Sequence, residues 1–108
     1  MALSTPPHSI EAEKSVIGSI LIDKEGIIHV ANLLAPEDFY DPAHGIIYSA
    51  MMDLFARNRP IDSITVREVI SDRKQLDSMW GNEYLAELLN SVFTTANIFQ
   101  SSQIVKNQ

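Results

Sequence analysis

The sequence predicts an all-α protein, a small bundle of about five or six short helices, from three observations. Apolar residues recur at helical spacing, residues that favour helix N-caps stand before those stretches, and prolines separate one stretch from the next. The 108 residues, of which 45% are hydrophobic, suit one domain. No internal repeat or proline-rich linker divides the chain.

The first predicted helix begins after Ser9, a favoured N-cap that follows two prolines. Glu11 and Glu13 fall in its first turn, where negative charge complements the helix dipole. The polar residues Glu13, Lys14 and Ser15 are expected to face the solvent. The expected buried stripe consists of Ile10, Val16, Ile17, Gly18, Ile20 and Leu21.

The next two elements are a short helix and the longest helix of the chain. The stretch "IIHVANLLA" predicts a brief helix that ends before Pro36, although the β-branched "GIIHV" leaves a short strand open. Pro36 opens another helical turn. The longest helix follows the Asp41 N-cap and ends near Asn58, because Pro60 comes next. Its expected core positions are Ile47, Met51, Leu54 and Phe55, with Tyr48 and Met52 at the margins.

Three helical stretches complete the prediction. The helix that contains "SITVREVI" begins at Asp62 or Ser63, and the helix "NEYLAELLNSVF" follows a loop. The last helix is capped by Thr94 or Thr95 and has no closing signal before Gln108, so we expect the sequence to stop inside it.

Composition excludes several classes of function. The formal net charge is −6, with basic residues single or paired, which argues against direct nucleic-acid binding. The absence of cysteine excludes disulfides and thiolate sites. We expect no membrane segment, and a cytoplasmic setting, because no long apolar run and no secretion signal is present.

The candidates for chemistry are weak. The four glycines are isolated, so no phosphate-binding loop is expected. Asp38, Asp41 and His44 could hold a metal, but helix capping beside a hydrogen-bonded histidine explains them better. His8 and His29 lack partners for nucleophilic catalysis, and the acidic pairs at helix starts suit the dipole. We therefore predict no catalytic residue, no metal and no cofactor in this chain.

Met79 and Trp80 interrupt an otherwise polar loop. They either cover the edge of the core or touch a partner protein, which makes this loop a candidate contact.

Five stretches in order carry a resemblance to a known family: "PPHSIEAEKSVIGSILID", "DFYDPAHGIIYSAM", "PID.ITV", "QLDSMWGNEYLAEL" and "ANI". Together they resemble the N-terminal domain of the DnaB-type replicative DNA helicases from Pro6 to Val105. The resemblance implies a flexible arm over 1–8, a helical bundle over 9–93, and the first arm of a helical hairpin over 94–108. It also implies a separate C-terminal RecA-like motor domain, absent from this chain, that uses ATP and Mg for 5′ to 3′ unwinding.

The resemblance further implies partners. Six copies of the domain would form a collar, as a trimer of dimers, that holds the helicase ring together and receives primase, with a helicase loader as another partner. Ile98, Ile104 and Val105 would pack against the second hairpin arm or a neighbouring subunit, and we expect them to be exposed here. The alternative is a free-standing, collar-like adaptor without a motor.

The sequence departs from the family pattern at three positions. Gly45 stands where relatives commonly have arginine, and a glycine inside a helix costs roughly 1 kcal/mol relative to alanine, so the helix start is expected to fray. Trp80 replaces one glycine of a pair, and Ser101 replaces a common tyrosine of the hairpin.

Overall fold

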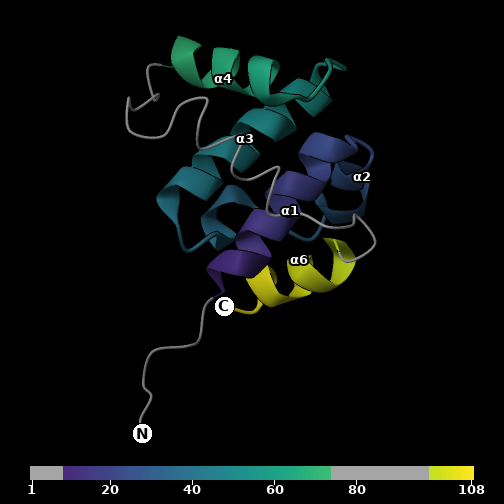
Figure 1. The fold of residues 1–108 in the computed structure, drawn as a ribbon, viewed down its shortest axis with the longest axis vertical. Helices are drawn as coiled ribbons and strands as arrows, with labels where there is room; N and C mark the ends of the chain where they lie inside the picture. Colours follow the sequence, from purple (N-terminus) through teal and green to yellow (C-terminus); the bar gives the residue numbers. More distant parts are fainter. Residues whose placement is uncertain (1–8, 74–97) are drawn as a thin grey trace, which may run out of the picture.

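The structure is a computed structural model that describes residues 9–73 and 98–108. These residues form helices and no strand, which confirms the all-α prediction (Figure 1). The segment 26–30 is a helix, so the strand alternative is wrong. The elements are α1 (Ile10–Ile22), α2 (Gly26–Val30), the 3-10 turn η1 (Pro36–Asp38), α3 (Pro42–Ala56), α4 (Ser63–Asp72) and α6 (Ile98–Lys106).

The predicted N-caps are confirmed for three helices. Ser9 Oγ accepts a hydrogen bond from Ala12 N at 3.0 Å, and Asp41 Oδ1 accepts one from Ala43 N at 2.9 Å. Asp62 caps α4 by accepting from two backbone amides. Each cap satisfies amides that the helix itself leaves without a partner, which fixes where the helix begins.

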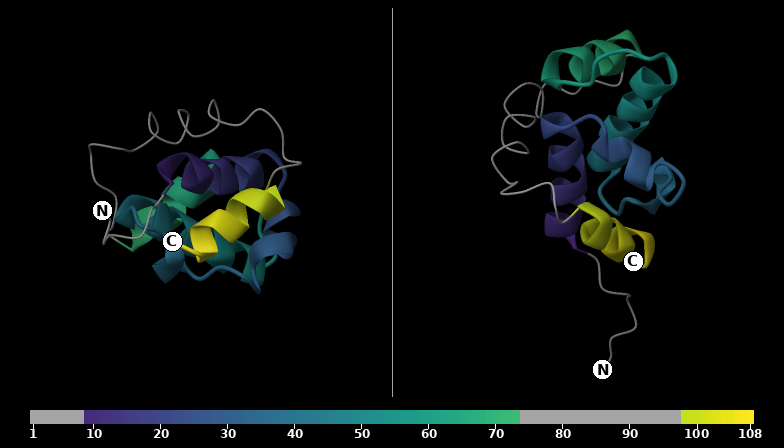
Figure 2. Two further views of the ribbon diagram at one scale, coloured as in Figure 1. Left: turned by 90° about the horizontal axis from the view of Figure 1, so that it is seen from below. Right: turned by 90° about the vertical axis from the view of Figure 1, so that its right-hand side faces the viewer.

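The core lies between α1, α3 and α6. Figures 1 and 2 show α6 beside the first half of α1, while α4 covers the opposite end of the molecule against α3. Most predicted stripe positions are buried. The fully buried apolar side chains include Val16, Ile17, Ile20, Ile27, Ile47, Met51 and Ile70.

Two predictions about α3 are wrong. Phe55 is exposed, and Tyr48 lies in the core rather than at its margin. The Tyr48 ring packs against Phe39 with ring centroids 5.1 Å apart, and its hydroxyl donates to the Leu34 carbonyl at 3.1 Å. A tyrosine can be buried fully where its hydroxyl has such an acceptor.

An ion-pair group joins α3 to α4. Asp53 Oδ2 lies 2.6 Å from Arg57 Nη2 and 3.4 Å from Arg73 Nη2. The hydrogen bond from Arg57 holds the pKa of Asp53 below its ordinary value. Arg73 also donates to Ser49 Oγ at 3.1 Å, so the end of α4 is fastened to the middle of α3.

Tyr48 makes stability depend on alkaline pH. Burial, with a contribution from the Asp38 charge, raises the pKa of Tyr48 to about 12 from 10.0. Tyr48 therefore keeps its hydroxyl proton to a higher pH in the folded state than in the unfolded state. The stability that this provides is fully present below pH 10 and is lost as the pH rises toward 12. We expect a loss of about 1 kcal/mol by pH 11.

Tyr48→Phe should remove this pH dependence of the unfolding free energy. It should also cost about 1 kcal/mol at neutral pH, because the Leu34 carbonyl loses a hydrogen-bond donor. Urea unfolding of both proteins at pH 7 and 11 measures the difference, and equal slopes would exclude Tyr48 as its source.

Helix α6 packs into the bundle. Ile98 and Val105 are buried in the core, so the expectation that they are exposed is wrong for these two residues. Only Ile104 of the three is exposed, with 46% of its surface accessible. Ser101 is also buried, and its hydroxyl bonds to Ser15 of α1 at 3.2 Å. The small residue at 101 thus lets α6 approach α1 closely.

The end of α6 differs from the prediction. The helix ends at Lys106, so Gln108 lies outside it rather than in a helix that runs to the last residue. Lys106 provides a basic residue in the last turn, which suits the helix dipole. In the described ranges, no helix is long and apolar enough to cross a membrane.

Candidate interaction site

A buried carboxylate organises the lower part of the bundle. Glu13 and His44 are both 0% exposed, and Glu13 Oε1 lies 2.7 Å from His44 Nδ1. Glu13 also accepts hydrogen bonds from the backbone amides of Tyr40 at 2.6 Å and Asp41 at 3.2 Å. The prediction that Glu13 faces the solvent is therefore wrong, because four segments converge on its carboxylate.

The fourth segment directly follows the end of α6. Gln108 Nε2 donates to Glu13 Oε2 and to the Asp38 carbonyl, the latter at 3.1 Å, while its Oε1 accepts from Ser9 N at 2.9 Å. Lys106 Nζ lies 3.5 Å from Asp38 Oδ2. We call Glu13, Asp41, His44 and Gln108 the Glu13 cluster. It joins the start of α1, the segment before α3, the first turn of α3 and the residues that follow α6.

The structure distributes the candidate metal ligands among separate tasks. Asp38 Oδ2 accepts from Ala35 N at 2.8 Å, and Asp41 caps α3. His44 bonds to Glu13 and lies 3.9 Å from Asp41 Oδ2. No group of three potential ligands that could hold a metal occurs in residues 9–73 and 98–108. Capping beside a hydrogen-bonded histidine, the interpretation preferred from the sequence, describes these residues.

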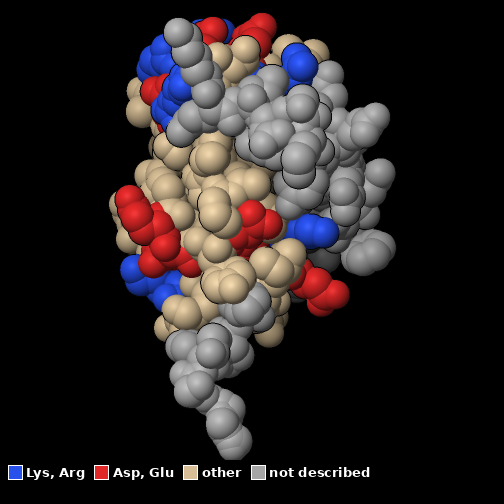
Figure 3. All heavy atoms as spheres, turned by 90° about the vertical axis from the view of Figure 1, so that its left-hand side faces the viewer, with Lys and Arg blue, Asp and Glu red and all other residues tan. Residues whose placement is uncertain are grey.

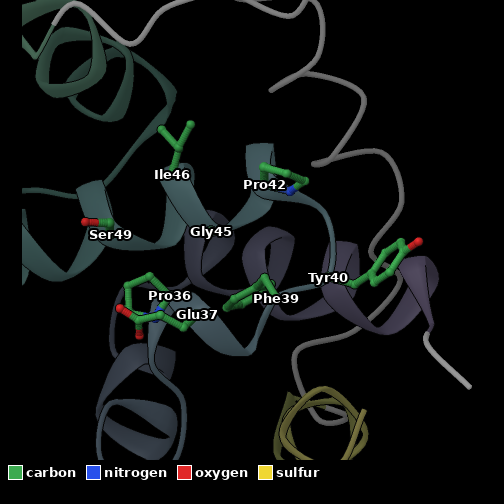
Figure 4. A pocket seen from close by; sticks show the side chains of 8 residues that line it. All are labelled: Pro36, Glu37, Phe39, Tyr40, Pro42, Gly45, Ile46 and Ser49. Atoms are coloured by element: carbon green, nitrogen blue, oxygen red, sulfur yellow. The ribbon is translucent and has the colours of Figure 1, made fainter. Parts of the chain in front are cut away.

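The described surface carries charged side chains of both signs. On the face shown in Figure 3, acidic and basic side chains of the described residues are interspersed. Close by the Glu13 cluster lies an open hollow of about 380 Å³, lined by Pro36, Glu37, Phe39, Tyr40, Pro42, Gly45, Ile46 and Ser49. Figure 4 shows Tyr40 directed away from the other lining side chains, at one end of the hollow.

Of the predicted contact residues, Ile104 lies on the outer face of α6 with the exposed Phe99. Ile98 and Val105 hold α6 against the bundle from its inner face. Met79 and Trp80 lie outside the described residues, so their contact with a partner stays a prediction.

Comparison with known proteins gives the family. Residues 5–107 match the family described as DnaB-like helicase N terminal domain. The chain belongs to this family. It is 38% identical over 103 residues to the replicative DNA helicase DnaB of Geobacillus stearothermophilus, and 37% identical over 103 residues to the replicative DNA helicase DnaC of Bacillus subtilis (strain 168). Both alignments cover 95% of this chain and 23% of the relative.

A solved structure supports the same relationship. The crystal structure of the N-terminal domain of DnaB helicase from Mycobacterium tuberculosis matches with a TM-score of 0.89 and 39% identity. The match covers 94% of this chain and 73% of that chain. The resemblance found in the five sequence stretches is therefore confirmed, and the fold is that of a DnaB N-terminal domain.

The spacing of residues in α1 could have predicted that Glu13 is buried. Glu13 lies three, four and seven residues before Val16, Ile17 and Ile20, which places it on the same face of α1 as the core stripe. An acidic residue on an apolar face indicates a buried partner. The partners themselves come from segments far along the chain, which the sequence does not bring together.

Proposed function

We propose that this chain is the N-terminal collar domain of a hexameric, ATP-dependent replicative DNA helicase, with roles in subunit assembly and primase docking. The observation that carries the proposal is the match to a DnaB N-terminal domain over nearly the whole chain. The chain spans about a quarter of the length of the curated helicases it matches. In this proposal the helicase activity, ATP and Mg belong to a motor domain elsewhere in a longer cytoplasmic protein.

The surface charge supports protein contacts as the role of this domain. The net charge of −6 repels phosphate, and three of the described basic residues, Arg57, Arg73 and Lys106, pair with carboxylates. Self-association, primase and a helicase loader are the proposed partners, and DNA is not.

The proposal is tested first by the source gene. A second hairpin helix, a linker and a G-x-x-x-x-G-K-[ST] loop encoded downstream of Gln108 would support a helicase, because that loop binds nucleotide phosphates. A reading frame that ends shortly after Gln108 would favour the motorless adaptor. Isothermal titration of the domain with the helicase-binding domain of the cognate primase then tests docking.

Ile104 is the position that tests subunit assembly. We expect Ile104→Glu to weaken self-association of the longer protein roughly tenfold while leaving the fold intact, because this side chain is exposed in α6. Sedimentation velocity over a concentration series measures the change. Ile64→Glu is the matched control, since Ile64 is also exposed but lies on α4. Equal effects of the two substitutions would contradict an interface at Ile104.

A further inference from the structure

A second surface lies at the other end of the bundle from the Glu13 cluster, where α2 meets the end of α3. A hollow of about 190 Å³ there is lined by Lys24, Glu25, Ile28, Phe55, Asn58 and Arg59, and we call it the α2–α3 groove. Ile28 is 57% exposed and Phe55 is 42% exposed. Two large apolar side chains thus remain open to solvent side by side, a pattern that marks interaction sites more often than single exposed residues do.

The backbone holds the groove in shape. Asn58, directly after the C-cap residue Arg57 of α3, adopts a left-handed conformation with φ of 56°. Arg59 N donates to the Leu54 carbonyl at 2.8 Å, which closes the helix end and brings Arg59 back beside Phe55. On the other side, Ile28 of α2 lines the groove together with Lys24 and Glu25, which precede the helix. Residues from two elements therefore meet in a fixed geometry.

The charges around the groove indicate its occupant. Lys24 and Arg59 are exposed, and neither has an ion pair or a side-chain hydrogen bond within residues 9–73 and 98–108. By contrast, Arg57, Arg73 and Lys106 all pair with carboxylates. Glu25 is the one acidic residue among the six that line the groove. In a chain of net charge −6, this groove is thus lined by two cations and one anion together with the apolar Ile28 and Phe55.

We propose that the α2–α3 groove docks a segment of a partner protein that presents one large apolar side chain next to carboxylates. A hollow of this volume is smaller than the roughly 300 Å³ at which small-molecule sites begin. It is near the roughly 150 Å³ that holds a benzene ring, so it suits a single side chain. The flanking carboxylates complement Lys24 and Arg59, which sets the direction of the segment and rejects basic sequences. The groove would bind such a segment whether or not the chain serves as a collar domain.

The groove is tested by titrating the full chain with peptides and following backbone amide signals by NMR. The probe is a short acetylated peptide with one phenylalanine between glutamates. We expect it to shift the amides of residues 24–28 and 55–59. The same peptide with lysines in place of glutamates should bind roughly tenfold more weakly. The double variant Lys24→Glu with Arg59→Glu should weaken binding of the acidic peptide by a similar factor. Phe55→Ser should weaken the binding of both peptides.

Matched controls separate the groove from general surface effects. Arg67→Glu removes another exposed cation that forms no ion pair within the described part of the chain, and Ile64→Ser removes another exposed apolar side chain, both on α4. Neither should change the peptide titration. The proposal is overturned if the shifts lie elsewhere, if the lysine peptide binds equally well, or if the charge reversal has no effect. If a thymine oligonucleotide shifts the groove amides, the occupant is nucleic acid and the proposal is overturned. If these amides shift with protein concentration alone, the occupant is a second copy of the chain and the proposal is likewise overturned.

Discussion

Replacing Glu13 with alanine is expected to destabilise the domain by about 3 to 5 kcal/mol, the cost of breaking a buried pair of ionisable groups by removing one partner. The substitution takes the acceptor from the buried His44 and from the Tyr40 and Asp41 amides. Gln108 also loses the bond that draws the end of α6 toward α1. Buried donors left without an acceptor carry their full desolvation cost, so the loss exceeds that of an ordinary surface carboxylate.

The measurement is urea unfolding followed by circular dichroism, with Glu11→Ala as the matched control. Glu11 stands in the same first turn and shares the dipole contribution, but it is exposed. Its loss should cost no more than about 0.5 kcal/mol. If Glu13→Ala unfolds the chain completely, Glu13→Gln keeps the shape and one acceptor oxygen and should cost less. Equal costs for Glu11→Ala and Glu13→Ala would show that the cluster contributes nothing.

His44 gives an independent check on the same cluster. We expect the double variant Glu13→Leu with His44→Leu to be more stable than either single variant, because removing both side chains leaves neither of them buried without its hydrogen-bond partner. The coupling energy from the double-mutant cycle should exceed about 1 kcal/mol, as for side chains in direct contact. A coupling energy near zero would mean that the two side chains act separately despite their 2.7 Å separation.

Local signals predicted the local structure well. Ser9, Asp41 and Asp62 each act through amides two or three residues away, so the sequence alone determines these caps. The apolar spacing of α1 and α3 likewise identified most core positions, because the period of a helix fixes which residues share a face. The family resemblance followed from the same local stretches and their order.

Contacts between distant segments could not be predicted in this way. Glu13 meets Tyr40 and Gln108, which lie 27 and 95 residues away in the sequence. Ile98 and Val105 were expected to be exposed and to pack against a second hairpin arm or a neighbouring subunit. They are instead buried in the core of this chain, because α6 packs back against α1. Tyr48 is buried and Phe55 is exposed, the reverse of what helical spacing predicted, and the burial of Tyr48 has a related reason. The acceptor that allows Tyr48 to be buried comes from the segment after α2.

Gly45→Ala is expected to destabilise the domain by about 1 to 2 kcal/mol, although helix propensity alone predicts a gain of roughly 1 kcal/mol. A Cβ atom at this position would lie 2.8 Å from the Pro36 carbonyl oxygen. That oxygen belongs to the backbone of η1 and cannot rotate away as a side chain could. The glycine that helix propensity alone predicts to be a weakness is therefore what lets η1 pack directly on the first turns of α3 (Figure 4).

Gly26→Ala is the matched control that separates crowding from propensity. A Cβ atom there would lie 3.1 Å from Ile98 Cδ1, the tip of a side chain that can move, and no other atom would be closer than 3.9 Å. We expect Gly26→Ala to be near neutral or stabilising and Gly45→Val to cost about 3 kcal/mol, measured by urea unfolding. If Gly45→Ala instead stabilised the protein as much as Gly26→Ala, helix propensity would outweigh the contact with Pro36. A loss at Gly45 alone would show that one close approach between η1 and α3 overrides the preference of the helix for alanine.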